Sequence, residues 1–109
     1  MVRLNDTGSS ATLDLHGASV AEAEELALKF VEKAAERGRR TVRIIHGSST
    51  TDDDPQNRTI KRALHDLLEE GAFDEWATSV IKRQDTLLIS LDLSAESSYQ
   101  PLTMLDIRR

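Results

Sequence analysis

The stretches Leu13-Asp14-Leu15-His16-Gly17 and Arg43-Ile44-Ile45-His46-Gly47 decide the fold, because each ends a short apolar run with a histidine followed by a glycine. If both runs are strands of one parallel sheet, the two His-Gly steps lie at the same edge of that sheet. Open α/β sheets usually place their ligands at this edge, beyond the carboxyl ends of the strands and before the helix N-termini. The repeat therefore predicts a site there.

The composition is that of one compact domain. The chain has 109 residues, 39% hydrophobic and 30% charged, which is enough for a single modest core. Its 14 basic and 19 acidic residues give a net charge of -5, which argues against unspecific coating of nucleic acid, because that binding neutralises phosphates. The absence of cysteine excludes disulfides and thiolate metal sites. With no signal peptide near Met1 and no apolar run of roughly 20 residues, a cytoplasmic location without membrane insertion is expected.

Apolar spacing and turn residues predict the secondary structure. Ser19 and Glu22 form a capping box at the start of the first helix, and Gly38 supplies its left-handed end. Asp54-Pro55 is typical of an N-cap followed by a first-turn proline. The predicted elements are a flexible polar lead-in at 1–11, a strand at 12–16, a helix at 20–37, a strand at 41–46, a helix from 55 until Gly71, and strands at 76–83 and 86–93.

This order, β-α-β-α-β-β, predicts an α/β two-layer sandwich. Right-handed crossovers through consecutive strands set both helices on one face of a four-stranded mixed sheet. Gln84-Asp85 is short enough for a hairpin between the last two strands, although it lacks glycine. The tail at 94–109 could cover the open face of the sheet, pair with a second copy to make a homodimer, or stay loose. Its apolar residues include Leu102, Met104, Leu105 and Ile107.

Residues 12–93 resemble the Smr domain, a family named from small MutS-related proteins. The resemblance rests on Leu13-Asp14-Leu15-His16, on the His46-Gly47 strand end and on Ile60-Lys61-Arg62-Ala63-Leu64, which keeps the basic character of the family's Leu-Arg-x-x-Val helix. The family's His-Gly-x-Gly loop survives only as His46-Gly47, and Arg83-Gln84-Asp85-Thr86 replaces the glycines that the family favours between its last strands. The resemblance implies the fold of the C-terminal domain of translation initiation factor three and, in several members, nucleic-acid binding with endonuclease activity.

The chemistry of phosphodiester hydrolysis can be assigned to Asp14, His16 and His46. The reaction needs a group that activates water, a means to neutralise charge, and a proton for the leaving oxygen. His16 would act as general acid or base, the role that an imidazole commonly takes, while Asp14 orients it or holds a divalent cation such as magnesium. The two residues lie two apart on a predicted strand, so their side chains are expected to share a face.

The start of the second helix is predicted to bind phosphate of DNA or RNA. Backbone amides and the positive end of the helix dipole would cradle the anion, and basic side chains would add charge. The predicted nucleic-acid-binding residues are Gly47, Ser48, Ser49, Arg58, Lys61 and Arg62. Asp52, Asp53 and Asp54 oppose this interpretation, because their carboxylates would repel a phosphate backbone if they lie beside the site.

Each assignment has a structural alternative. A histidine beside a glycine at a strand end often only closes a turn, and Asp14 could simply accept backbone hydrogen bonds. His65 is expected to be a solvated helix residue. Two functions therefore stay open from the sequence: an endonuclease that acts through Asp14, His16 and His46, or a non-catalytic module that docks nucleic acid or a protein through the same edge or the tail.

Overall fold

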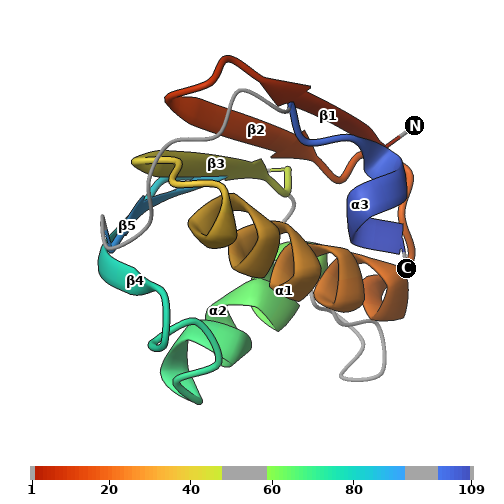
Figure 1. The fold of residues 1–109 in the computed structure, drawn as a ribbon. Helices are drawn as coiled ribbons and strands as arrows, with labels where there is room; N and C mark the ends of the chain where they lie inside the picture. The colour runs from red at the N-terminus through yellow and green to blue at the C-terminus, as the bar shows by residue number, and fades with distance from the viewer. Residues whose placement is uncertain (1, 48–58, 93–100, 109) are drawn as a thin grey trace.

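The computed structural model describes residues 2–47, 59–92 and 101–108. Its strands form one mixed sheet, and its helices cover one face of that sheet (Figure 1). The elements are β1 Arg3–Asp6, β2 Ser10–Asp14, α1 Val20–Glu36, β3 Thr41–Ile45, α2 Ile60–Glu69, β4 Ala77–Lys82, β5 Thr86–Leu91 and α3 Met104–Arg108. The predicted α/β two-layer class is confirmed. Within the described ranges, no helix is both long enough and apolar enough to cross a membrane.

The strand order of the sheet places both His-Gly steps at one edge. The order is β1-β2-β3-β5-β4, with β2 and β3 parallel and all other neighbours antiparallel. The paired residues of β2 and β3 run from Ser10 opposite Thr41 to Asp14 opposite Ile45, so the two strands end side by side. We call this edge, formed by residues 14–17 and 45–47, the rim.

The N-terminal residues form a hairpin instead of the predicted flexible lead-in over 1–11. β1 pairs antiparallel with β2, so the sheet has five strands where four were predicted. In the turn, the Asp6 carboxylate accepts a hydrogen bond from the Gly8 amide at 2.9 Å, and Gly8 has a φ of +96°. Polar residues with glycine are common in hairpin turns as well as in linkers, so the composition of this segment concealed the strand.

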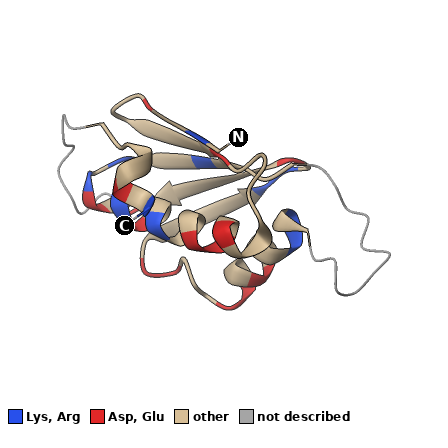
Figure 2. Ribbon diagram, turned by 90° about the vertical axis from the view of Figure 1, so that its right-hand side faces the viewer, with Lys and Arg blue, Asp and Glu red and all other residues tan. Residues whose placement is uncertain are grey.

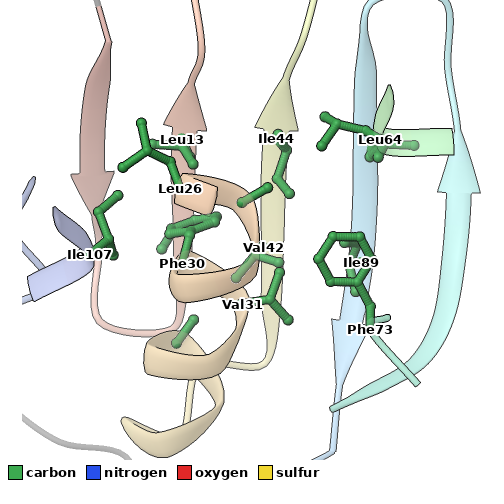
Figure 3. Packing of buried hydrophobic residues seen from close by; sticks show 14 of the residues in the cluster. Leu13, Leu26, Phe30, Val31, Val42, Ile44, Leu64, Phe73, Ile89 and Ile107 are labelled. Carbon is green, nitrogen blue, oxygen red and sulfur yellow. The ribbon is translucent and has the colours of Figure 1, made fainter. Parts of the chain in front are cut away.

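The hydrophobic core lies between the sheet and the helices (Figure 3). Alternate residues of β2, β3 and β5 face the apolar stripes of α1 and α2, which is why the strands show a period of two and the helices a spacing of three and four. Fully buried members of this core are Leu13, Leu15, Phe30, Val31, Ile44, Leu64, Leu87 and Ile89. The capping of α1 also follows the prediction, because Ser19 Oγ accepts a hydrogen bond from the Glu22 amide at 3.1 Å.

The described part of the tail packs on the helix side of the molecule. α3 lies beside α1 (Figure 1), with Leu102 and Ile107 buried in the core and Leu105 63% exposed. A guanidinium nitrogen of Arg37 lies 3.2 Å from a carboxylate oxygen of Asp106 in α3. Residues 101–108 therefore extend the helix layer, and none of the described elements lies over the opposite face of the sheet.

A buried ion pair ties the two ends of the chain together. Arg39, after α1, donates two hydrogen bonds of 2.8 Å to the two carboxylate oxygens of Asp6, and both side chains are 1% exposed. The Leu102 amide donates a third bond, of 2.7 Å, to the same carboxylate. Burial raises the pKa of Asp6, but the bonds from Arg39, Gly8 and Leu102 outweigh it and leave the pKa below its ordinary value. The hairpin, the α1–β3 turn and the tail thus form one unit.

Candidate functional site

The rim borders a hollow of about 260 Å³ at the start of α2. Its lining residues are Asp14, Leu15, His16, Gly17, Ile45, His46, Gly47 and Ile60. All three residues that the sequence analysis selected for catalysis contribute to this lining. They come from the ends of β2 and β3, two strands whose parallel register brings their ends together.

Asp14 closes the turn that follows β2. Its Oδ1 accepts a hydrogen bond of 2.9 Å from the His16 amide. Because β2 ends at Asp14, the predicted strand over 12–16 is two residues too long at its end, and His16 is an exposed turn residue rather than a strand residue. Among the described residues, no group donates to Asp14 Oδ2. One carboxylate oxygen therefore shapes the backbone of this turn.

His46 is buried on the side of the sheet that packs against α2. Its side chain follows Val42 and Ile44 in the strand alternation, and the residue is only 8% exposed. Its Nδ1 lies 2.6 Å from the Gly47 carbonyl oxygen, and since a carbonyl only accepts, Nδ1 carries a proton. The Nε2 atom is buried and has no hydrogen-bond partner in the described part of the chain. Burial lowers the pKa of His46, and the opposing effect of the Gly47 carbonyl does not offset it.

His65, on α2, packs against the ring of His46. The two rings meet edge to face, with centroids 5.8 Å apart and planes at 90°. Burial lowers the pKa of His65, as do the charges of Lys82 and of His46 itself. The prediction of a solvated His65 is therefore wrong, because the residue is half-buried and its Nε2 is enclosed. His65 directly follows Leu64 at the margin of the apolar stripe of α2, and this position could have indicated its partial burial.

The backbone after β3 is fixed by the β4–β5 turn. The amides of His46 and Gly47 both donate to the Asp85 carbonyl oxygen, at 2.9 and 3.2 Å. The predicted use of the Gly47 amide as a phosphate donor is therefore not met in this arrangement, since that amide already has an acceptor. Gly47 itself is exposed at the rim and has a φ of +89°. Ser48 and Ser49 lie outside the described residues.

The first turn of α2 carries two of the predicted basic residues, Lys61 and Arg62. Thr59 caps this helix, its Oγ1 accepting from the Arg62 amide at 3.1 Å. Lys61 is close enough to both histidines for its charge to lower their pKa. Arg62 is exposed and pairs with Asp66 at 3.6 Å. The other predicted features of this segment lie outside the described residues: Arg58, the Asp54-Pro55 cap, and Asp52, Asp53 and Asp54.

Comparison with known proteins places this geometry in a family. The model of the Smr domain matches residues 13–81, from the first His-Gly strand into β4. The chain belongs to the Smr domain family. The Smr domain of Thermus thermophilus MutS2 has a similar structure, with a TM-score of 0.58 and 23% identity over 74% of this chain and 96% of that chain. This likeness shows the shared fold. No curated protein sequence matches the chain significantly.

A second hollow of this Smr domain lies between α1 and α3. It is larger, about 400 Å³, and is lined by Glu22, Glu25, Leu26, Leu28, Lys29, Glu32, Ile107 and Arg108. It contains neither His-Gly step, and Glu22 and Arg108 are ion-paired across it at 3.6 Å. Its greater size therefore does not make it the stronger candidate for chemistry.

The rim of the Smr domain offers a carboxylate for a divalent cation. Within residues 2–47, 59–92 and 101–108, no three histidine, aspartate or glutamate side chains lie close enough to hold a metal ion together. Magnesium commonly needs less from a protein, because one or two carboxylates suffice when water and substrate phosphates complete its octahedral shell. Asp14 fits that mode of binding.

Proposed function

We propose that this Smr domain binds nucleic acid at the rim and hydrolyses its phosphodiester bonds as an endonuclease. The observation that carries the proposal is the hollow that Asp14, His16 and His46 line together. These residues lie at or just beyond the ends of β2 and β3, and their convergence beside the start of α2 is the arrangement in which open α/β sheets hold phosphorylated ligands.

Asp14 and His16 are assigned to the chemistry. The exposed imidazole of His16 would transfer a proton to or from the attacking water or the leaving oxygen. Asp14 Oδ2 would orient that water or hold a divalent cation such as magnesium against the phosphate. Lys61 would add positive charge near the developing anion.

His46 is assigned to positioning rather than to proton transfer. Its Nε2 is buried, its Nδ1 is engaged by the Gly47 carbonyl, and its ring contacts His65. The catalytic role predicted for His46 is revised accordingly: it would hold the end of β3 against α2, so that the rim keeps its shape.

The hydrogen bond from the His16 amide to Asp14 favours a second candidate function. That bond is sufficient reason for an aspartate at this position, because it closes the turn without any chemistry. The alternative is a non-catalytic module that docks nucleic acid or a protein through the same rim.

One experiment separates the two functions. The purified chain is incubated with labelled single- and double-stranded RNA and DNA, with and without magnesium. The double variant Asp14→Ala/His16→Ala and the helix-layer control Glu25→Ala/Lys29→Ala are treated in parallel. Cleavage lost in the first variant and kept in the control supports the nuclease, whereas cleavage that survives in the first variant refutes the assigned residues. Binding without cleavage by the unmodified chain supports the module.

A further inference from the structure

The face of the sheet opposite the helices is open in the described structure, and we call it the open face (Figure 1). Its side chains are the strand residues that alternate with the buried ones. The register aligns Arg3, Asp14, Ile45 and Thr86 in a row along the rim. The next row aligns Arg43, Leu88 and Ile81. Serine, threonine and asparagine occupy the other open-face positions of the strands.

Charge is divided between the two sides of the molecule. On the open face the strands carry Arg3 and Arg43 against the carboxylate of Asp14. Just beyond the strands, Arg83, opposite Thr86, adds a positive charge, and the exposed Asp92, which follows Leu91, adds a negative one. By contrast, α1, α2 and the turn at 70–76 carry ten acidic and four basic residues (Figure 2). The helix side is therefore strongly acidic, whereas the described open face carries three arginines against two aspartates and is weakly positive.

Apolar side chains lie between the arginines of the open face. Ile81 is 54% exposed, and Ile45 and Leu88 are half-buried although no helix of the described residues covers them. Neighbouring strands lie about 4.8 Å apart, so the strand of Arg43 lies roughly 10 Å from the strand of Arg3 on one side and from β4 on the other. Ile45 and Leu88 thus flank Arg43, one along β3 and the other across to β5, and Ile81 lies beyond Leu88 on β4.

We propose that the open face binds a single strand of RNA or DNA, laid across the β-strands from β1 to β4 so that its backbone passes Asp14. This inference rests on the proposed function and adds the form of its substrate. The arginines would contact phosphates, and the apolar row would contact sugars and the faces of unpaired bases.

The chemistry of the open face favours a single strand over a duplex. A duplex stacks its base faces inside, where Ile81 and Leu88 could not reach them. Electrostatic binding of a duplex also commonly draws on roughly 6–10 phosphate contacts, more than the arginines of this face can make. A single strand uses both kinds of side chain that the face presents.

Two matched pairs of variants test this inference. Ile81→Glu and Leu105→Glu each add one negative charge at an exposed apolar residue, the first on the open face and the second on α3. Arg43→Gln and Lys29→Gln each remove one positive charge, the first on the open face and the second on α1. Affinity is measured by fluorescence anisotropy with a labelled oligonucleotide of roughly 12 residues, within the span that single-strand-binding sites occupy. EDTA removes divalent cations, and gel electrophoresis of the oligonucleotide after each titration verifies that it is still intact.

The two open-face variants are expected to lose about tenfold or more in affinity, roughly 1.4 kcal/mol each, while both controls stay within about twofold of the unmodified chain. The duplex of the same sequence is expected to bind more weakly than the single strand. Equal affinities for open-face and control variants, or a duplex bound as tightly as the single strand, would overturn the inference. So would a change of oligomeric state in Ile81→Glu, because a second copy would then occupy the face.

The same measurements keep this inference apart from the proposed nuclease. If the chain binds the single strand through Arg43 and Ile81 but never cleaves it, the proposed nuclease activity is refuted and the open-face inference is supported. Cleavage that depends on Asp14 but is indifferent to Arg43 and Ile81 would remove only the open-face inference. A chain that binds no nucleic acid would overturn both.

Discussion

The imidazole of His46 meets that of His65 edge to face at 5.8 Å, and each ring buries an Nε2 that has no hydrogen-bond partner among the described residues. This contact joins the residue after β3 to α2, on the helix side of the rim. Burial is the largest cause of the lowered pKa of both rings. Both histidines are therefore neutral in the folded domain at neutral pH.

Acid is expected to destabilise the fold through this pair. In the unfolded chain both histidines take up protons near pH 6.5, whereas in the folded chain they do so only at lower pH. The unfolded state thus binds protons first as the pH falls, so the stabilisation is fully present above about pH 6.5 and is lost progressively below it. Urea unfolding midpoints measured across this range report the effect.

Variants of His65 and His16 test whether the pair is the source of this pH dependence. His65→Leu is expected to flatten the dependence, because it removes one titrating ring and the repulsion between the two. His16→Ala is expected to leave the dependence unchanged, because His16 is exposed. An undiminished dependence in His65→Leu would show that the pair is not its source.

Asp6→Asn is expected to destabilise the domain by about 3–5 kcal/mol, because it removes the buried carboxylate that accepts two hydrogen bonds from the buried Arg39 guanidinium. The free energy of unfolding in urea measures this loss. Lys33→Ala, which breaks the exposed pair with Glu36, is the matched control and should cost less than about 1 kcal/mol. Similar losses in the two variants would mean that the Asp6–Arg39 pair does not hold the ends of the chain.

Gly47→Ala is expected to cost about 1–2 kcal/mol of stability, because the left-handed backbone is unfavourable for alanine even where its Cβ meets no atom of the described residues within 4 Å. Gly8→Ala has the same handedness and the same open space, so a similar loss is expected there. Only the Gly47 variant should also slow cleavage, since only Gly47 lines the rim hollow. Equal cleavage rates in the two variants would separate Gly47 from the site.

Local patterns predicted the central elements of the fold. The capping box at Ser19, the spacing of apolar residues in α1 and the alternation in β5 each involve residues close in sequence, so they could be recognised without coordinates. The positions of β1 and α3 depend instead on distant partners. Asp6 meets Arg39, 33 residues away, and Leu102, 96 residues away. Nothing in the hairpin or the tail alone specifies those partners.

The candidate site was predictable in position but not in detail. The repeat of His-Gly after two apolar runs indicated a shared edge, and the parallel register of β2 and β3 provides one. The sequence could not show that the two histidines differ in burial. His46 continues the buried alternation of β3, whereas β2 ends at Asp14 and leaves His16 in an exposed turn. That difference separates a positioning role from a chemical one.

Binding of a single strand should depend only weakly on salt. If Arg3, Arg43 and Arg83 each contact one phosphate, the slope of log affinity against log salt concentration should be roughly -2. Anisotropy titrations over a series of salt concentrations give this slope. Arg43→Gln should make the slope shallower by less than one, and Lys29→Gln should not alter it. A slope several times steeper would mean that many more cations contact the backbone than the open face provides.

The most direct test of the rim as a nuclease site is the single-turnover cleavage rate of Asp14→Asn in magnesium. Asparagine keeps an Oδ1 that can accept the His16 amide, so the turn is preserved and only the charge of the side chain is lost. Cleavage is expected to fall about 100-fold or more, with oligonucleotide affinity and unfolding free energy close to those of the unmodified chain. Cleavage at an unchanged rate would contradict the account, because Asp14 would then serve only to shape the turn.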